Sequence, residues 1–553
     1  MTRQRISRRV FIRGSVGAAG ATLAATPALL SSAQVSAREA TTGPQGTSSE
    51  LESAECPATR LQKASKVYKR RYEGPRWHLI YGSYSGAEEF ALSELQKMTQ
   101  RYVPYVIEVR QASGPADHDA NLLVVGTGVN NPLIAEIASK GAFELPTKPE
   151  SYTTICLRSP WNKERRIVVV AGADSSGTLY GVIDFNKRLA SLTSDDPTRI
   201  RETLDDLGEF SAEESPALEN RGIWSWGYVI YDYRRFIDNM ARLKLNRLLF
   251  WNDIPPLNCR EIIDYAHSRG VKVVLGFPWG WGIDNLNPNS SEDLQLVKDD
   301  VLCRVATSYE HLGMDAIYFQ TFTETSNKEV GGKPIAVLAR DWVNEITAAV
   351  LTRYPQLHVE WGLHATSILE NYKDLESLDP RVEIVWEDAG VIPYSYDPLP
   401  TIPEGRYHNS LDNIDATIAY SKKLATFRPH NEFAMVAKGW TTLRWASEFE
   451  HPGPFIMGER APGFIRERLR ERQARWDYVN RLWFVNYPYA LRFLREVRDS
   501  ASKMTVVALI EDGLFEEKIQ PSAALFAEML WDPRRSTNDL LEHAMNPYYT
   551  RIT

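Results

Sequence analysis

Short apolar runs alternate with amphipathic helical stretches over the last 330 or so residues of the chain. The eight runs span residues 221–226, 246–253, 271–282, 315–325, 357–365, 382–390, 433–440 and 505–513. Strands that are apolar along nearly their whole length are typical of a parallel sheet buried on both faces. Eight strand-and-helix units predict a (β/α)8 barrel over residues 220–535, with a doubly wound open sheet as the alternative.

A second, smaller alternation of strands and helices precedes the barrel. It covers residues 76–192 and predicts a compact α/β domain without catalytic function. Its two glycine-rich turns, GTGVNN at 126–131 and GADSSG at 172–177, do not have the spacing of a dinucleotide fingerprint. Asn131 stands where the third glycine would be needed, so no nucleotide cofactor is expected.

The segments around these two domains differ in composition. Residues 1–37 contain a twin arginine, a mild apolar stretch and a small-residue cleavage site, which predict a Tat-type export signal. The apolar stretch is too short for a transmembrane span, so we expect no stable membrane insertion after cleavage and a periplasmic or secreted protein. Residues 38–75 are polar and small and predict a flexible linker, residues 193–219 an acidic connector, and residues 536–553 a C-terminal tail.

The charge and the cysteine content limit the kinds of partner and cofactor that we expect. Without residues 1–37 the chain holds 59 Lys and Arg against 71 Asp and Glu, a formal net charge of −12. This balance favours neither nucleic acid nor an anionic membrane surface as a partner. The four cysteines are scattered without metal-ligand spacing, and two disulfides or buried thiols are both compatible with them. No metal or organic cofactor is implied, and the oligomeric state stays open.

Nearly every predicted barrel strand ends in Trp or in an ionisable residue. These positions include Trp224, Trp226, Trp251, Asn252, Trp279, Trp281, Glu324, Trp361, His364, Trp386, Glu387, Asp388, Trp440 and Glu511. In (β/α)8 barrels the carboxyl ends of the strands carry the active site. A purely structural set of Trp would be scattered along strands and outer helices. The concentration at one rim therefore predicts a cleft lined by stacking surfaces and carboxylates.

Aromatic surfaces with several carboxylates suit glycoside hydrolysis, in which one carboxylic acid protonates the leaving oxygen and a second carboxylate acts as base or nucleophile. Glu324 is the candidate acid, since the neighbouring Phe322 would help to raise its pKa. Glu387 or Asp388 is the candidate second carboxylate. Each acid could equally be a solvated strand-end residue or the partner of a nearby Arg.

The sugar site is predicted from the same rim. Its expected ligands are Trp226, Trp251, Asn252, Trp279, Trp281, Trp361, His364, Trp440 and Glu511. His364 could orient a substrate hydroxyl, although a lone His is as often a structural side chain.

Two stretches resemble known enzymes. SPALENRGIW (215–224) resembles the entry to the first barrel strand in glycoside hydrolase family 20, and GADSSGTLYGVIDF (172–185) resembles the small domain before the barrel in family 20 hexosaminidases and family 67 α-glucuronidases. The resemblance implies that Arg221 holds ring hydroxyls of a terminal sugar and that Glu324 is the acid of the fourth strand. Thr323 stands where family 20 hexosaminidases carry an Asp, so the resemblance does not extend to substrate-assisted cleavage of an N-acetylhexosaminide.

These observations predict an exported glycoside hydrolase that acts on a terminal sugar of an oligo- or polysaccharide. Two alternatives stay open. A carbohydrate-binding protein on a degenerate barrel would keep the aromatic rim without carboxylates at reaction distance. A structural or partner-binding surface protein would have no pocket where the strand ends converge.

Overall fold

The computed structural model describes most of the chain from Pro75 onward, which forms one compact unit. The described residues are 72, 74–113, 118–193, 202–252, 254–280, 283, 285–321, 323, 328–364, 368–387, 414–440, 454–510 and 514–552. The predicted signal at 1–37 and nearly all of the predicted linker at 38–75 lie outside these ranges. Among the candidate site residues, Trp281, Glu324, Asp388 and Glu511 also lie outside them.

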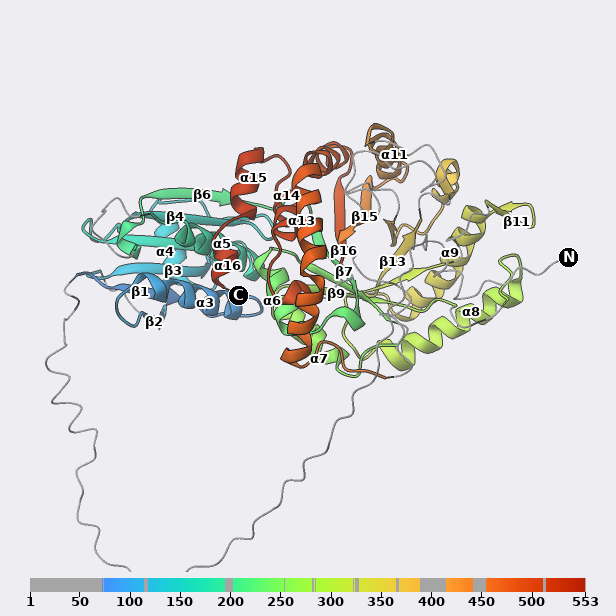
Figure 1. The fold of residues 1–553 in the computed structure, drawn as a ribbon, viewed down its shortest axis with the longest axis horizontal. Coiled ribbons are helices and arrows are strands. Elements are labelled where there is room, and N and C mark those ends of the chain that lie inside the picture. Colours follow the sequence, from blue (N-terminus) through green and yellow to red (C-terminus); the bar gives the residue numbers. More distant parts are fainter. Residues whose placement is uncertain are drawn as a thin grey trace, which may run out of the picture. The chain divides into compact units, whose positions relative to one another are not determined.

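Eight parallel strands close into a barrel, which confirms the predicted (β/α)8 fold (Figure 1). In barrel order they are β7 (Asn220–Trp226), β8 (Arg247–Trp251), β9 (Lys272–Gly276), β10 (Ala316–Gln320), β13 (His358–Leu363), β14 (Val382–Trp386), β15 (Glu432–Trp440) and β16 (Lys503–Ile510). Parallel pairing of β16 with β7 closes the ring.

Helices follow the strands along the chain, as a (β/α)8 barrel requires. They are α6 (Tyr233–Arg242), α7 (Cys259–His267), α8 (Ser291–Arg304) with the π-helix η5 (Val305–Tyr309), α9 (Ile335–Arg353), η6 (Leu369–Leu375), α11 (Ile414–Thr426), α13 (Pro462–Arg498) and α14 (Pro521–Trp531). Short elements in the loops are η4 (Gly227–Val229), η7 (Leu514–Glu516) and the hairpin of β11 (Glu329–Val330) and β12 (Lys333–Pro334). Local sequence sets helix starts: the Asp232 side chain caps α6 by accepting from the Arg235 amide.

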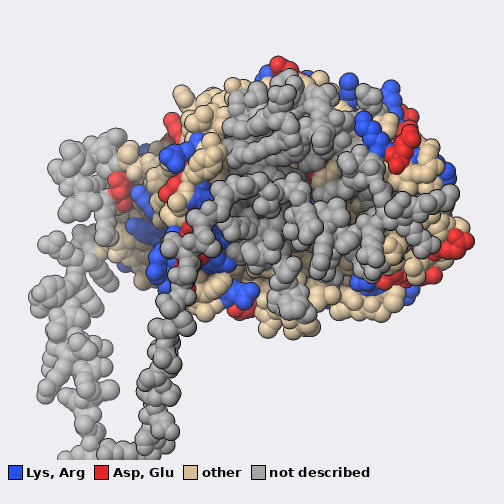
Figure 2. Space-filling model, turned by 45° about the vertical axis from the view of Figure 1, so that its right-hand side comes forward, with Lys and Arg blue, Asp and Glu red and all other residues tan. Residues whose placement is uncertain are grey.

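Charged side chains of both signs are interspersed on the described surface in Figure 2. In the described ranges, no helix combines the length and the apolar character needed to cross a membrane.

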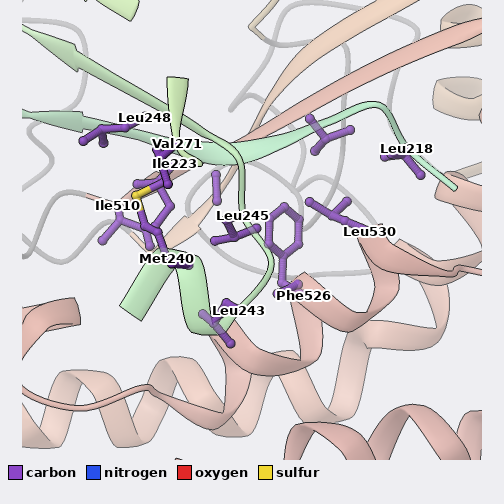
Figure 3. Packing of buried hydrophobic residues seen from close by; sticks show 14 of the residues in the cluster. Leu218, Ile223, Met240, Leu243, Leu245, Leu248, Val271, Ile510, Phe526 and Leu530 are labelled. Atoms are coloured by element: carbon purple, nitrogen blue, oxygen red, sulfur yellow. The ribbon is translucent and has the colours of Figure 1, made fainter. Parts of the chain in front are cut away.

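Alternate residues of each barrel strand face opposite sides. One set packs outward against the helices, where Ile223 and Ile510 gather beside Met240 of α6 (Figure 3). The other set fills the barrel interior and includes Trp224 and Trp251. Because side chains alternate with a period of two, neighbours in one strand belong to different cores.

The smaller domain is a six-stranded sheet in the order β2-β1-β3-β5-β4-β6. Its strands are β1 (Trp77–Tyr81), β2 (Glu108–Gln111), β3 (Asn121–Thr127), β4 (Tyr152–Arg158), β5 (Arg166–Gly172) and β6 (Phe210–Glu214). The helical elements are α3 (Glu88–Thr99), η2 (Gln100–Tyr102), α4 (Pro132–Ser139), α5 (Ser175–Ala190) and η3 (Leu204–Asp206). β4 is antiparallel to both of its neighbours, β5 and β6.

Two segments without a predicted fold take part in this architecture. β6 lies in the expected connector 193–219 and pairs with β4, so an acidic stretch with few apolar residues still supplies an edge strand. The expected tail 536–553 forms α15 (Thr537–Ala544) and α16 (Tyr548–Arg551). The buried Tyr548 hydroxyl donates to Glu94 of α3 at 3.2 Å, which ties the end of the chain to the small domain.

Candidate active site

Glu387 is the carboxylate around which the described part of the rim is organised. It directly follows β14, and its backbone amide donates to the Leu363 carbonyl at 3.0 Å, which fixes its place at the strand end. The residue is 7% exposed. The Tyr318 hydroxyl donates to its Oε1 at 2.5 Å, and the Gln320 amide nitrogen donates to the same oxygen. Two neutral side chains of one strand, β10, thus hold one carboxylate oxygen.

A glycine makes this contact possible. β13 lies between β10 and β14, so Tyr318 must reach across it to meet Glu387. A Cβ on Gly362 of β13 would lie 2.0 Å from the Tyr318 hydroxyl and 2.8 Å from Glu387 Oε1. No side chain fits at that position without displacing the pair. Two residues later, His364 brings its Nε2 to 3.4 Å from Glu387 Oε2.

The Tyr318 hydroxyl is a permanent donor. Burial raises the pKa of Tyr318 well above its usual value, and the nearby charge of Glu387 raises it further. Its ring is braced edge-on by Trp224 and Trp251, at centroid distances of 6.2 Å and 5.8 Å. Gly276 leaves the space for Trp251, because a Cβ there would lie 2.7 Å from the indole.

The predicted aromatic platform is only partly present. Trp224 and Trp251 are 5% and 1% exposed and fill the barrel interior, while Trp226 packs against them and is half-buried. Of the Trp residues inside the barrel, Trp226 therefore keeps the most surface for a ligand.

Three other Trp residues predicted at the sugar site face the helices instead. Trp361 is fully buried in the outer core, because the residues on either side of it in β13 point into the barrel. Trp440 stacks on Trp483 of α13 at 3.9 Å, and Trp279 stacks on Phe319 at 3.8 Å. These Trp side chains serve packing, and the structure does not bring them to Glu387.

Arg221 lies at the opposite end of the barrel from the rim. It is the second residue of β7, is fully buried, and donates to the Leu218 carbonyl at 2.6 Å. Its guanidinium also pairs with Glu150 of the small domain at 2.7 Å. The structure therefore places Arg221 in an ion pair between the two domains and not in the predicted sugar site.

Asn252 keeps its place at the rim. It follows β8, is 4% exposed, and lies against Gly227, where a Cβ would be 2.2 Å from Asn252 Oδ1. Within the described residues neither side-chain amide atom of Asn252 has a hydrogen-bond partner. A buried amide in this state favours a ligand or water that would complete its hydrogen bonds.

Sequence reasoning did not find Tyr318, Gln320 and Gly362. The alternation in 315–325 was the available signal, since residues 318 and 320 share one face of the strand. Glu516 of η7 was missed as well. Its Oε1 accepts from the backbone amides of Tyr231 at 2.7 Å and Asp232 at 3.1 Å, and burial raises its pKa well above the usual value.

One group of side chains has the spacing of metal ligands. His358, Glu360 and Glu383, at the amino ends of β13 and β14, offer ligand atoms within 4.8 Å of one another. Arg247 pairs with Glu360, and Lys503 Nζ lies 3.5 Å from Glu383 Oε1. These two cations already neutralise the carboxylates, so the group fits a network of ion pairs better than a metal centre.

Comparison with known proteins shows which solved structures have a similar fold. No family model and no curated protein sequence matches the chain. Among solved structures, a family GH115 4-O-methyl-α-glucuronidase with specificity for decorated arabinogalactans is similar over 86% of this chain and 59% of its own, at 14% identity and a TM-score of 0.50. A β-N-acetylhexosaminidase from Bacteroides fragilis is similar over 87% of this chain and 90% of its own, at 14% identity and a TM-score of 0.46.

These similarities are to structures of low sequence identity and concern the fold. The chain spans 59% of the length of the glucuronidase. The architecture of this chain is a closed parallel barrel together with a small α/β domain. The protein therefore has the fold of the barrel group of glycoside hydrolases to which its sequence shows a resemblance.

Proposed function

We propose that the protein is a glycoside hydrolase in which Glu387 is the second catalytic carboxylate, acting as base or nucleophile. The observation that carries the proposal is the setting of Glu387: a nearly buried carboxylate at the carboxyl end of a barrel strand, held on one oxygen by Tyr318 and Gln320. Active sites of (β/α)8 barrels lie at this end. Among the described residues no Arg or Lys pairs with this carboxylate, whereas a buried structural acid is expected to have such a partner.

Glu324 is the proposed general acid. It follows β10, the strand that also carries Tyr318 and Gln320, by four residues. In the proposed reaction Glu324 gives a proton to the leaving oxygen while Glu387 acts at the anomeric carbon or on a water molecule. A separation of the two carboxyl groups of about 5 Å would make the enzyme retaining, and roughly 6.5–9.5 Å would make it inverting.

The proposed substrate is a terminal sugar of an oligo- or polysaccharide, met outside the cytoplasm after export. Two sugar classes come first in a search. The similar fold of an α-glucuronidase supports trying α-glucuronides, and the resemblance of the small domain to that of hexosaminidases supports trying N-acetylhexosaminides. Thr323, in place of an Asp, weighs against the second class.

A panel of chromogenic glycosides tests the proposal. The enzyme is expected to hydrolyse at least one member, with Glu324→Gln removing turnover and leaving binding of the sugar largely intact. Glu310→Gln is a matched control, because this exposed glutamate precedes β10 at the other end of the barrel. If Glu324→Gln hydrolyses as fast as the parent protein, the acid is wrongly assigned.

The main alternative is a carbohydrate-binding protein without turnover. It predicts saturable sugar binding with no hydrolysis of any panel member, and equal binding by the parent and by Glu387→Gln. A partner-binding surface protein predicts neither binding nor hydrolysis.

A further inference from the structure

The two oxygens of the Glu387 carboxylate have different surroundings. Oε1 accepts hydrogen bonds from the Tyr318 hydroxyl and from the Gln320 amide. Neither of these groups donates to Oε2, whose neighbour is the His364 ring nitrogen at 3.4 Å. A proton on Oε1 would meet two donor hydrogens, so this oxygen can neither carry nor receive a proton while both contacts are made.

We propose that Tyr318 and Gln320 are positioning residues that hold Oε1 of Glu387 and thereby present Oε2 as the reacting oxygen. The inference rests on the proposed function and names the atom that acts in it. As nucleophile, Oε2 forms a bond to the anomeric carbon while the glycosidic C–O bond breaks and the leaving oxygen takes the proton of the acid. As base, Oε2 takes a proton from water, whose oxygen attacks the same carbon.

The packing around Tyr318 supports a positioning role. A carboxylate held by a mobile donor would not be oriented, but the Tyr318 ring is clasped between Trp224 and Trp251 inside the barrel. Gly276 makes room for one of these indoles, and Gly362 makes room for the hydroxyl. The buried Trp residues therefore act through Tyr318 on Glu387, and reactive groups held by such packed neighbours keep their geometry within fractions of an ångström.

His364 lies on the Oε2 side of the carboxylate. It follows β13 on the same inward face as Gly362, and its ring lies beside Oε2 and not beside Oε1. A substrate atom that approaches Oε2 would meet this ring. His364 is thus the described side chain that we expect to contact the sugar next to the reacting oxygen.

The test uses Tyr318→Phe, which removes one hydroxyl and keeps the ring. With a substrate found in the glycoside panel, kcat is expected to fall about 10- to 100-fold with little change in KM, since a hydrogen bond to a charged group is lost. A residue with only a structural role would lower the melting temperature without this loss of kcat per folded molecule.

Two further variants make the result decisive. Gln320→Met removes the second donor and is expected to lower kcat with little change in KM, as Tyr318→Phe does. Tyr309→Phe is the matched control, because its buried hydroxyl has no hydrogen-bond partner among the described residues and lies in the outer core. This control is expected to leave kcat and KM unchanged.

A crystal structure of Tyr318→Phe separates this inference from the proposed function. The Glu387 carboxylate is expected to leave its present orientation in that variant. An unmoved carboxylate, or an unchanged kcat, would overturn the positioning role even for an active glycosidase. If the parent protein hydrolyses no glycoside, the proposed function fails, and the position of the Glu387 carboxylate in the crystal still decides whether Tyr318 holds it.

Discussion

Buried carboxylates at the two ends of the barrel interior have different kinds of partner. At the amino ends of the strands, Glu360 and Glu383 meet Arg247 and Lys503, and Thr505 donates a hydrogen bond to Glu383 at 2.9 Å. At the carboxyl ends, Glu387 is held by two neutral donors, Tyr318 and Gln320.

This difference indicates a structural role for the amino end and a functional role for the carboxyl end. The described charges at the amino end form ion pairs with each other, so they serve mainly to stabilise the fold. At the carboxyl end, Tyr318 and Gln320 orient Glu387 without carrying charge, and the further ion-pair partner of its carboxylate among the described residues is the His364 ring. Such an arrangement costs stability and is typical of a site that completes its interactions with a substrate.

The largest expected effect follows from removing the charge at the carboxyl end. Glu387→Gln keeps the size of the side chain, so Tyr318 can still donate to it. Turnover of the best panel substrate is expected to fall by at least about a thousandfold, while the melting temperature stays the same or rises. A large loss of stability with full activity would reverse the roles assigned to the two ends.

At the amino end the same kind of change is expected to act on stability. Glu383→Gln removes the negative charge that faces Arg247 and Lys503. This loss should lower the free energy of unfolding by about 3 kcal/mol. Urea unfolding at pH 7 measures this loss, and kcat per folded molecule should be unchanged. Equal stability of variant and parent would contradict the account of this end.

The same glutamate gives the amino end a pH dependence. Burial alone would raise the pKa of Glu383, but the hydrogen bond from His358 and the charges of Arg247 and Lys503 hold it below its usual value. The stabilisation is therefore complete above the unfolded-state pKa of about 4.3 and is lost as pH falls through the folded-state pKa. The stability difference between the parent and Glu383→Gln is expected to shrink on acidification below about pH 4.

A smaller effect is expected at the contact between the domains. Arg221→Met removes the partner of Glu150, which is itself partly exposed, so unfolding should be easier by about 2 kcal/mol. Binding of the sugar should not change, because Arg221 lies far from the rim. A raised KM with unchanged stability would restore Arg221 as a sugar ligand.

The smallest expected effect concerns Glu516, a carboxyl in the segment after β16. Burial raises its pKa, so its contribution to stability is present below the unfolded-state pKa and is lost as pH rises through the folded-state pKa. Glu516→Gln keeps an acceptor for the amides of Tyr231 and Asp232. It should remove the loss of stability that the parent protein shows as pH rises. Unfolding of both proteins at pH 5 and pH 8 checks it, and parallel pH profiles would contradict it.

The repeated pattern of the sequence was enough to predict the barrel, because eight apolar runs separated by helices have few other solutions. It did not decide which strand-end residues face inward. Trp361 is next to Gly362, and Trp386 is next to Glu387, so only one residue of each pair can point into the barrel. A prediction that counts every Trp near a strand end, without regard to this alternation, gives the sugar site more Trp residues than can face it.

The support of Glu387 could not be predicted for a different reason. Tyr318, Gly362 and Glu387 come from three strands, and their contact depends on the register of those strands and on a missing side chain. A sequence pattern does not contain this register. Likewise, β6 and α16 are short elements with few apolar residues, and their tertiary partners stabilise them.

Chemical rescue shows whether Glu387 is the reacting carboxylate. In Glu387→Ala, sodium azide is small enough to take the place of the missing carboxylate or of its activated water. We expect the hydrolysis rate of the variant to rise with azide concentration and a glycosyl azide to form, with no such effect on the parent protein. A variant that keeps its activity without azide, or that forms no glycosyl azide at any concentration, would contradict the claim.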